Sequence, residues 1–189
     1  MNSNKFRTFV SELEESWPLS STDKLWRDSP YGWIRTRSSG TKGKIAVQIA
    51  GRILEDAGYS PHLDEGGIKV QDQFIIVRSS FMWGKNCWKF QQIRDTKFHY
   101  LLCLGFHPRD DAYIWLIPSH RIYANGALQK KAGLHRQHGG KKGTEDAWLH
   151  IEAANPLEGW TGEYGSHLVD VEGIFEKCLT ASEAEHKQQ

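Results

Sequence analysis

The chain has 189 residues, 39% of them hydrophobic and 25% charged, which excludes a disordered protein and favours one folded domain. The formal net charge is +1, from 24 Lys and Arg against 23 Asp and Glu, so bulk charge cannot hold nucleic acid and only a local basic patch would do so. The three cysteines form no CxxC pair, and no apolar run is long enough to span a membrane. We therefore expect a soluble cytoplasmic protein with no membrane partner.

The N-terminal part predicts an amphipathic helix and an irregular connection. Apolar residues recur at helical spacing from Phe6 to Trp17, and Pro18 ends the pattern. Such a helix either covers the core or forms a dimer face. Residues 18–41 are rich in Ser, Pro, Gly and aromatic residues, which indicates an ordered but irregular connection. We divide the chain into an N-terminal segment at 1–40 that packs on the core, an α/β core at 41–120, a C-terminal extension at 121–180 and a tail at 181–189.

The core is predicted from alternating helical and extended patterns. Apolar residues recur at helical spacing from Thr41 to Gly58, and a glycine is a favourable residue just past a helix. Ile68–Val70 alternates like a short strand. The stretch Gln73–Ser80 holds four consecutive apolar residues, which predicts a strand buried on both faces and paired with its predecessor in a hairpin.

The elements after this central strand complete the expected fold. The segment Lys89–Asp95 predicts another helix, and the apolar runs Tyr100–Phe106 and Ala112–Pro118 predict two strands. Helix, strand, helix, strand, strand defines an α/β fold with a mixed central sheet flanked by helices. Residues 147–151 predict a late strand, and residues 171–179 predict a short terminal helix.

Three basic segments are candidate DNA contacts. Residues 35–44 contain no acid, residues 85–97 interleave basic with aromatic residues, and residues 130–143 form a Gly-rich basic stretch. Each segment is alternatively a solvated surface. His135 and His138 lack further ligands at the spacing of a zinc site. The candidate DNA-binding residues are Arg35, Arg37, Lys42, Lys44, Lys85, Lys89, Gln91, Gln92, Arg94, Lys130, Lys131, Arg136, Lys141 and Lys142.

Five stretches of the core, taken in order, resemble the PD-(D/E)XK restriction-endonuclease-like superfamily, and are most similar to its small bacterial members. These stretches are Gly40–Ala50, Asp64, Phe74–Ser80, Phe90–Asp95 and Tyr100–Gly105. The resemblance implies a helix Glu, an Asp at the start of a strand hairpin, and a central strand ending in (Asp/Glu)-x-Lys. In that superfamily the carboxylates hold Mg²⁺, and the Lys positions or deprotonates the attacking water.

Residue by residue, the resemblance places the helix Glu at Val47, the Asp at Asp64, the strand carboxylate at Ile76 and the Lys at Arg78. Two ligand positions are therefore apolar. Arg78 stays protonated and cannot act as a base, although its guanidinium suits a phosphate. We expect a catalytically degenerate protein with no metal cofactor, which binds double-stranded DNA or a DNA-processing partner, with bacterial defence as the implied setting.

Two alternatives stay open. The first is an active Mg²⁺-dependent endonuclease in which Asp64, Glu65 and Asp72 serve as relocated metal ligands. Asp72 lies four residues before Ile76, about 13 Å away along an extended strand, so the hairpin would have to fold it back. The second alternative is a non-catalytic subunit or scaffold in a homo- or hetero-oligomer.

Overall fold

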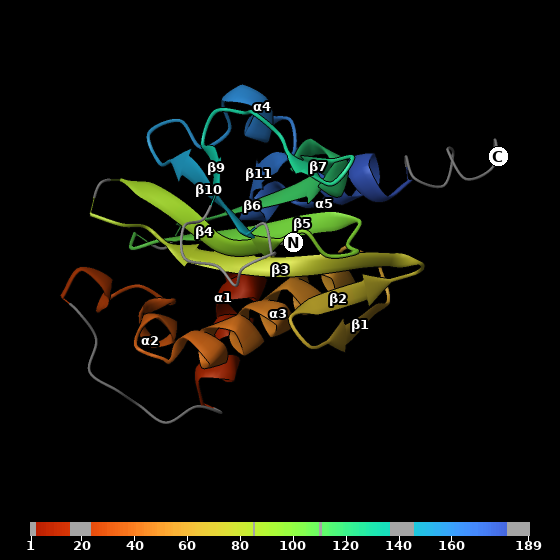
Figure 1. Cartoon of the computed structure of the whole chain (residues 1–189). Coiled ribbons are helices and arrows are strands. Elements are labelled where there is room, and N and C mark those ends of the chain that lie inside the picture. The colour runs from red at the N-terminus through yellow and green to blue at the C-terminus, as the bar shows by residue number, and fades with distance from the viewer. Residues whose placement is uncertain (1–2, 16–23, 85, 110, 137–145, 181–189) are drawn as a thin grey trace.

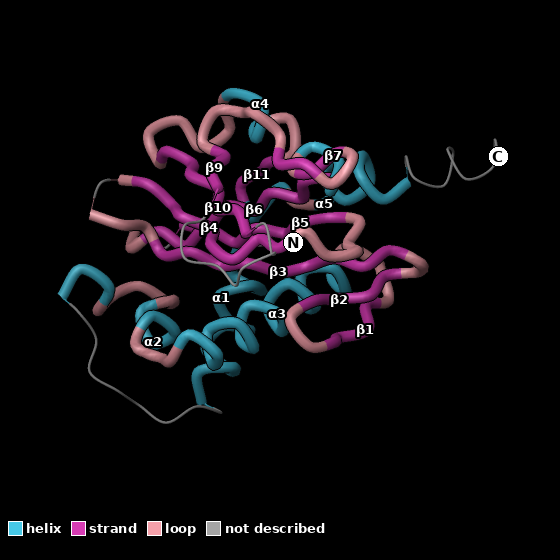
Figure 2. Tube along the Cα trace, in the orientation of Figure 1, coloured by secondary structure: helices cyan, strands magenta, loops and turns pink. Residues whose placement is uncertain are grey.

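The protein has three layers: helices, a six-stranded mixed sheet, and a smaller three-stranded sheet (Figures 1 and 2). The structure is a computed structural model, and it describes residues 3–15, 24–84, 86–109, 111–136 and 146–180. In the view of Figure 1 the helices α1, α2 and α3 lie below strand β3 of the large sheet, and β4, β9 and β10 lie above β3. This arrangement confirms the expected α/β class with a mixed central sheet.

The helical elements fall mainly at the two ends of the chain. They are α1 (Ser3–Glu15), η1 (Lys24–Trp26), α2 (Gly32–Arg35), α3 (Ser39–Asp56), η2 (Ser119–Arg121), α4 (Gly159–Gly162), η3 (Leu168–Asp170), α5 (Glu172–Phe175) and η4 (Glu176–Thr180). The long helix α3 begins slightly before its expected start because Ser38 caps it. The Thr41 backbone N–H donates a hydrogen bond to Ser38 Oγ at 3.3 Å, which satisfies one of the free donors of the first turn. Among the helices of the described ranges, none combines the length and apolar character needed to cross a bilayer.

The strands form three sheets. They are β1 (Pro61–Asp64), β2 (Gly67–Val70), β3 (Gln73–Phe81), β4 (Cys87–Arg94), β5 (Tyr100–His107), β6 (Asp111–Pro118), β7 (Tyr123–Ala124), β8 (Ala127–Leu128), β9 (Leu134–Arg136), β10 (Asp146–Glu152) and β11 (Gly165–His167). The large sheet has the order β1-β2-β3-β5-β6-β11, the second has the order β4-β10-β9, and β7 pairs with β8. Only the pair β3–β5 is parallel; the other described pairs are antiparallel.

The expected helix at Lys89–Asp95 is wrong, because residues 89–94 belong to strand β4. Trp88 and Phe90 are fully buried and Lys89 between them is not, which is the alternation of a strand. A β-bulge interrupts the alternation of buried and exposed residues in this segment, so the sequence does not show the regular pattern of a strand. The pairing with β10 shifts between Ala147 and Leu149, so that Gln91 and Gln92 together face Trp148, and Gln92 adopts a positive φ of 57°.

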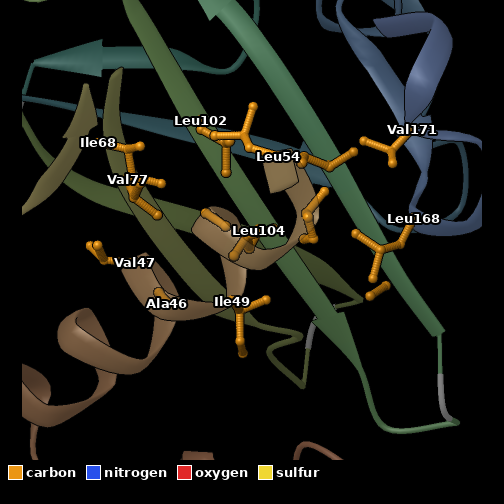
Figure 3. Packing of buried hydrophobic residues seen from close by; sticks show 14 of the residues in the cluster. Ala46, Val47, Ile49, Leu54, Ile68, Val77, Leu102, Leu104, Leu168 and Val171 are labelled. Carbon is orange, nitrogen blue, oxygen red and sulfur yellow. The ribbon is translucent and has the colours of Figure 1, made fainter. Parts of the chain in front are cut away.

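Two separate cores lie on the two faces of the large sheet. Residues of β3 alternate between the two cores. Ile75 and Val77 pack in the core between the sheet and the helices, whereas Ile76 packs in the core between the sheet and β4, β9 and β10. We call these the helix-side core and the strand-side core. Figure 3 shows Val47 of α3 and Val77 of β3 within the helix-side core. A strand segment that is buried on both faces in this way carries consecutive apolar residues, as Phe74–Val77 of β3 does.

The segments outside residues 41–120 pack on both cores. Phe6 and Val10 of α1, together with Phe175 of α5, are buried in the helix-side core. Leu134 of β9 and Leu149 of β10 are buried in the strand-side core. Each such side chain stabilises the fold by about 1.5–3 kcal/mol relative to exposure. The C-terminal extension therefore supplies two of the three strands, β9 and β10, that cover the strand-side core.

Candidate functional site

The four positions that the resemblance assigns to an active site do not converge. Val47 lies on α3 and is buried in the helix-side core, whereas Ile76 is buried in the strand-side core. Arg78 follows Ile76 by two residues and so lies on the same face of β3 as Ile76. The central sheet therefore separates the helix position from the two strand positions.

Asp64 lies on the same face as Ile76 but is two strands away. Asp64 pairs with Gly67, and Gly67 pairs with Ile76, so the Cα atoms of the two outer residues are about 10 Å apart. The Phe74 ring fills the space between them, since a Cβ placed on Gly67 would lie 2.8 Å from Phe74 Cζ. Asp64 Oδ1 instead accepts a 2.7 Å hydrogen bond from the Glu65 backbone N–H within its own turn.

The relocated carboxylate set is also divided. Glu65 lies in the turn between β1 and β2, and Asp72 lies in the turn between β2 and β3, so the two residues occupy opposite ends of β2. Four residues of extended strand span about 13 Å, which is too far for a shared Mg²⁺ ion. Within the described ranges, His, Cys, Asp and Glu side chains nowhere form a group of three or more suited to a metal ion.

Arg78 holds strand β4 against strand β3. Its Nε and Nη2 donate hydrogen bonds to the Gln92 carbonyl at 3.2 and 2.8 Å, and its Nη1 donates to the Val77 carbonyl at 2.8 Å. Gln92 is the bulge residue with positive φ, so Arg78 satisfies a carbonyl that leaves the regular ladder. Burial lowers the pKa of Arg78; Arg94 lowers it further, whereas Cys103 and Asp146 raise it. The geometry gives Arg78 a structural role at the corner between the sheets.

Ser80, like Arg78, connects strand β3 to strand β4. Its buried Oγ accepts a 2.9 Å hydrogen bond from the Lys89 backbone N–H. We expect Ser80→Ala to lower the free energy of unfolding by about 1–2 kcal/mol in urea titrations, because it leaves that N–H without its acceptor. The matched control is Ser79→Ala on the opposite face of β3, which should change stability by less than about 0.5 kcal/mol. Equal losses in the two variants would contradict this role for Ser80.

The first basic segment lies on the helix side of the large sheet. The Arg35 and Arg37 guanidinium groups lie over the rings of Trp26 and Trp33, at 5.5 and 5.8 Å from the ring centroids. Lys42 Nζ lies 5.9 Å from the centroid of Phe81. Burial lowers the pKa of Lys42, and the Arg35 charge lowers it further. Lys44 is exposed on α3.

The second and third basic segments meet on the small sheet β4-β10-β9. Lys89 and Gln91 of β4 point away from the strand-side core, and Gln91, Gln92 and Arg94 are exposed. Arg94 pairs with Asp146 of β10, with its Nε 3.7 Å from Asp146 Oδ1. These segments therefore lie on the opposite side of the large sheet from residues 35–44.

The remaining candidates of the third segment lie at one edge of this sheet or outside the described residues. Lys130 is exposed, and Lys131 Nζ lies 5.1 Å from the Trp160 centroid. Arg136 ends β9 and is exposed. The candidates Lys85, Lys141 and Lys142 lie outside the residues that the structure describes.

The outer side of the small sheet gathers aromatic rings around one lysine. Lys89 Nζ lies 5.4 Å from the centroid of Trp83 and 5.5 Å from that of Trp148. The His135 ring stacks on Trp148 with the centroids 4.3 Å apart and an interplanar angle of 24°, and the His150 centroid lies 6.2 Å from Trp148. We call the set Trp83, Lys89, His135, Trp148 and His150 the stacking face.

Four residues of the stacking face were not among the sequence candidates: Trp83, His135, Trp148 and His150. The sequence contains the pattern that identifies two of them. Trp148 and His150 alternate with the apolar residues of β10, so they point outward when those residues point inward. The contact between His135 and Trp148 could not be predicted from the sequence, because it depends on the pairing of β9 with β10. No protein-family model matches the chain, and no curated protein matches it.

Proposed function

We propose that the protein binds DNA through the stacking face and does not cut it. The observation that carries this proposal is the Lys89 ammonium group between the rings of Trp83 and Trp148 on the outer side of a sheet. A cation provides attraction for phosphates, and neighbouring rings provide surfaces on which bases stack. Gln91, exposed on the same side of β4, adds an amide that suits a base edge.

The resemblance to the PD-(D/E)XK superfamily supports a DNA-processing context for this proposal. The order of helix α3, hairpin β1-β2, central strand β3 and parallel strand β5 agrees with the expectation, whereas strand β4 stands where a helix was expected. The absence of cleavage is proposed because Asp64 lies apart from both Ile76 and Asp72. Cys87, Cys103 and Cys178 are buried free thiols, which supports a reducing compartment such as the cytoplasm.

The proposal predicts a salt-dependent effect at Lys89. We expect Lys89→Ala to weaken DNA binding about fivefold and to reduce the slope of log affinity against log salt by about 1, since one phosphate contact is lost. The matched control is Lys97→Ala, which removes an equal charge from an exposed position between β4 and β5. Electrophoretic mobility shifts over a range of salt concentrations measure both variants.

Three results would count against the proposal. Absence of DNA binding by the unmodified protein at low salt removes it, and leaves a non-catalytic subunit or scaffold to be sought by mass measurement of complexes. Equal losses in Lys89→Ala and Lys97→Ala would show binding to be diffuse rather than centred on the stacking face. Plasmid nicking with Mg²⁺ or Mn²⁺ that disappears in Asp64→Ala would establish an endonuclease instead.

A further inference from the structure

Resting on the proposed function, we infer that the stacking face takes unpaired bases, so that its ligand is single-stranded DNA rather than duplex. The inference depends on the juxtaposition of Trp83, from the turn before β4, with Lys89, Trp148 and His135 of the strands β4, β10 and β9. Neighbouring groups in this set, either an ammonium nitrogen and a ring centroid or two ring centroids, lie 4.3 to 5.5 Å apart. Rings bind bases by their faces, and base faces are accessible only where the bases do not already stack in a duplex.

Trp83 presents its ring from a fixed backbone. Its N–H donates to the Cys87 carbonyl at 2.9 Å, and its carbonyl accepts from the Asn86 N–H at 2.9 Å, so both backbone groups are held in the turn between β3 and β4. The side chain is nevertheless 52% exposed, the most exposed tryptophan among the described residues. A large ring exposed to water on a backbone held by two hydrogen bonds is ready to stack, since little backbone freedom is left to lose on binding.

The charge of the stacking face favours binding by base stacking over binding by several phosphate contacts. Lys89 is the single lysine or arginine within the stacking face, and the nearby Arg94 is paired with Asp146. The whole chain carries a net charge of +1. Duplex binders gain most of their affinity from several phosphate contacts, whereas single-strand binders add about 1–3 kcal/mol from each base stacked on an aromatic ring.

The shape of the face also disfavours a duplex. The face is built on three paired strands, β4, β10 and β9, with Lys89 opposite His150 and Trp148 opposite His135. The major groove of DNA admits an α-helix or a two-stranded ribbon. A single strand can instead lie across an open sheet with its bases against the rings, as sheet-based single-strand binders do.

The experiment compares an oligothymidylate of about 20 nucleotides with a duplex of equal length by fluorescence anisotropy at one salt concentration. We expect the unmodified protein to bind the single strand at least tenfold more tightly. Trp83→Ala and Trp148→Ala should each weaken single-strand binding roughly 5- to 100-fold and duplex binding less than about twofold. Trp83→Tyr, which keeps a ring, should retain most of the affinity. Leu157→Ala is the control, because it removes an exposed apolar side chain from a different part of the surface.

Far-ultraviolet circular dichroism and urea unfolding confirm that each variant folds. Two outcomes overturn this inference and leave the proposed function standing: duplex binding as tight as single-strand binding, or equal losses for both ligands in Trp83→Ala. Single-strand binding that is unchanged in both tryptophan variants also overturns it. Absence of binding to either DNA removes the proposed function and, with it, this inference.

Discussion

Ile76→Asp is expected to destabilise the protein by about 4 kcal/mol or more and to confer no Mg²⁺-dependent cleavage. The substitution restores the acidic residue type at the position where the PD-(D/E)XK resemblance places a carboxylate. Ile76 is only 6% exposed and packs in the strand-side core with Trp88 and Leu101. A carboxyl group there is removed from water without a partner prepared for it, since the Arg78 guanidinium already donates to two backbone carbonyls.

Cleavage is not expected because one carboxylate would still stand alone. Asp64 is two strands away behind the Phe74 ring, and Val47 faces the opposite core. Mg²⁺ is held by several oxygen ligands in a compact octahedral arrangement, which these positions do not provide. The double variant Val47→Glu with Ile76→Asp should therefore also be inactive.

Urea unfolding and a plasmid-nicking assay with Mg²⁺ measure these two expectations. The matched control is Ile76→Val, which keeps an apolar side chain and should cost about 1 kcal/mol. A folded Ile76→Asp protein that nicks plasmid would show that position 76 belongs to a working site.

The helix α3 and the strands β3, β5 and β6 were predictable because their patterns are local. The helix α3 shows its apolar spacing within one segment, and β3, β5 and β6 each contain a run of at least four apolar residues. By contrast, β4 gains its identity from β10, which lies more than fifty residues later in the chain. A bulge at Gln92 interrupts its alternation, so the local pattern favoured a helix.

The side of the sheet on which a residue of β3 lies was not predictable. Ile75, Ile76 and Val77 are all apolar because both faces of β3 are buried, so their sequence contains no alternation that assigns a face. The sequence therefore could not show that Val47 and Ile76, to which the resemblance assigns two ligands of one site, lie on opposite sides of the sheet. The same reasoning explains the stacking face, whose rings meet only after β9 pairs with β10.

Arg78→Ala is expected to lower the free energy of unfolding by about 3 kcal/mol, the second large effect. The side chain donates three hydrogen bonds to the carbonyls of Val77 and Gln92, and hydrogen bonds to charged groups each contribute about 1.5–3 kcal/mol. Its removal takes two donated hydrogen bonds away from the Gln92 carbonyl of the bulge. It also leaves Asp146, which is only 7% exposed, with one fewer neighbouring cation.

Arg78→Lys separates shape from charge at this position. A lysine keeps the positive charge but lacks the planar fork that reaches two carbonyls, so we expect it to recover less than half of the lost stability. Lys97→Ala is the control for a lost cation at an exposed position, and it should change stability by less than about 0.5 kcal/mol. Urea unfolding followed by tryptophan fluorescence measures all three variants.

The same variants decide between the two roles considered for Arg78. If Arg78 holds the sheets together, Arg78→Ala lowers stability. The fraction of molecules that remains folded under native conditions then binds DNA with nearly unchanged affinity. If Arg78 holds a phosphate, stability is unchanged and affinity falls. The positions of the Val77 and Gln92 carbonyls favour the first result, since both hydrogen-bond the guanidinium that a phosphate would need.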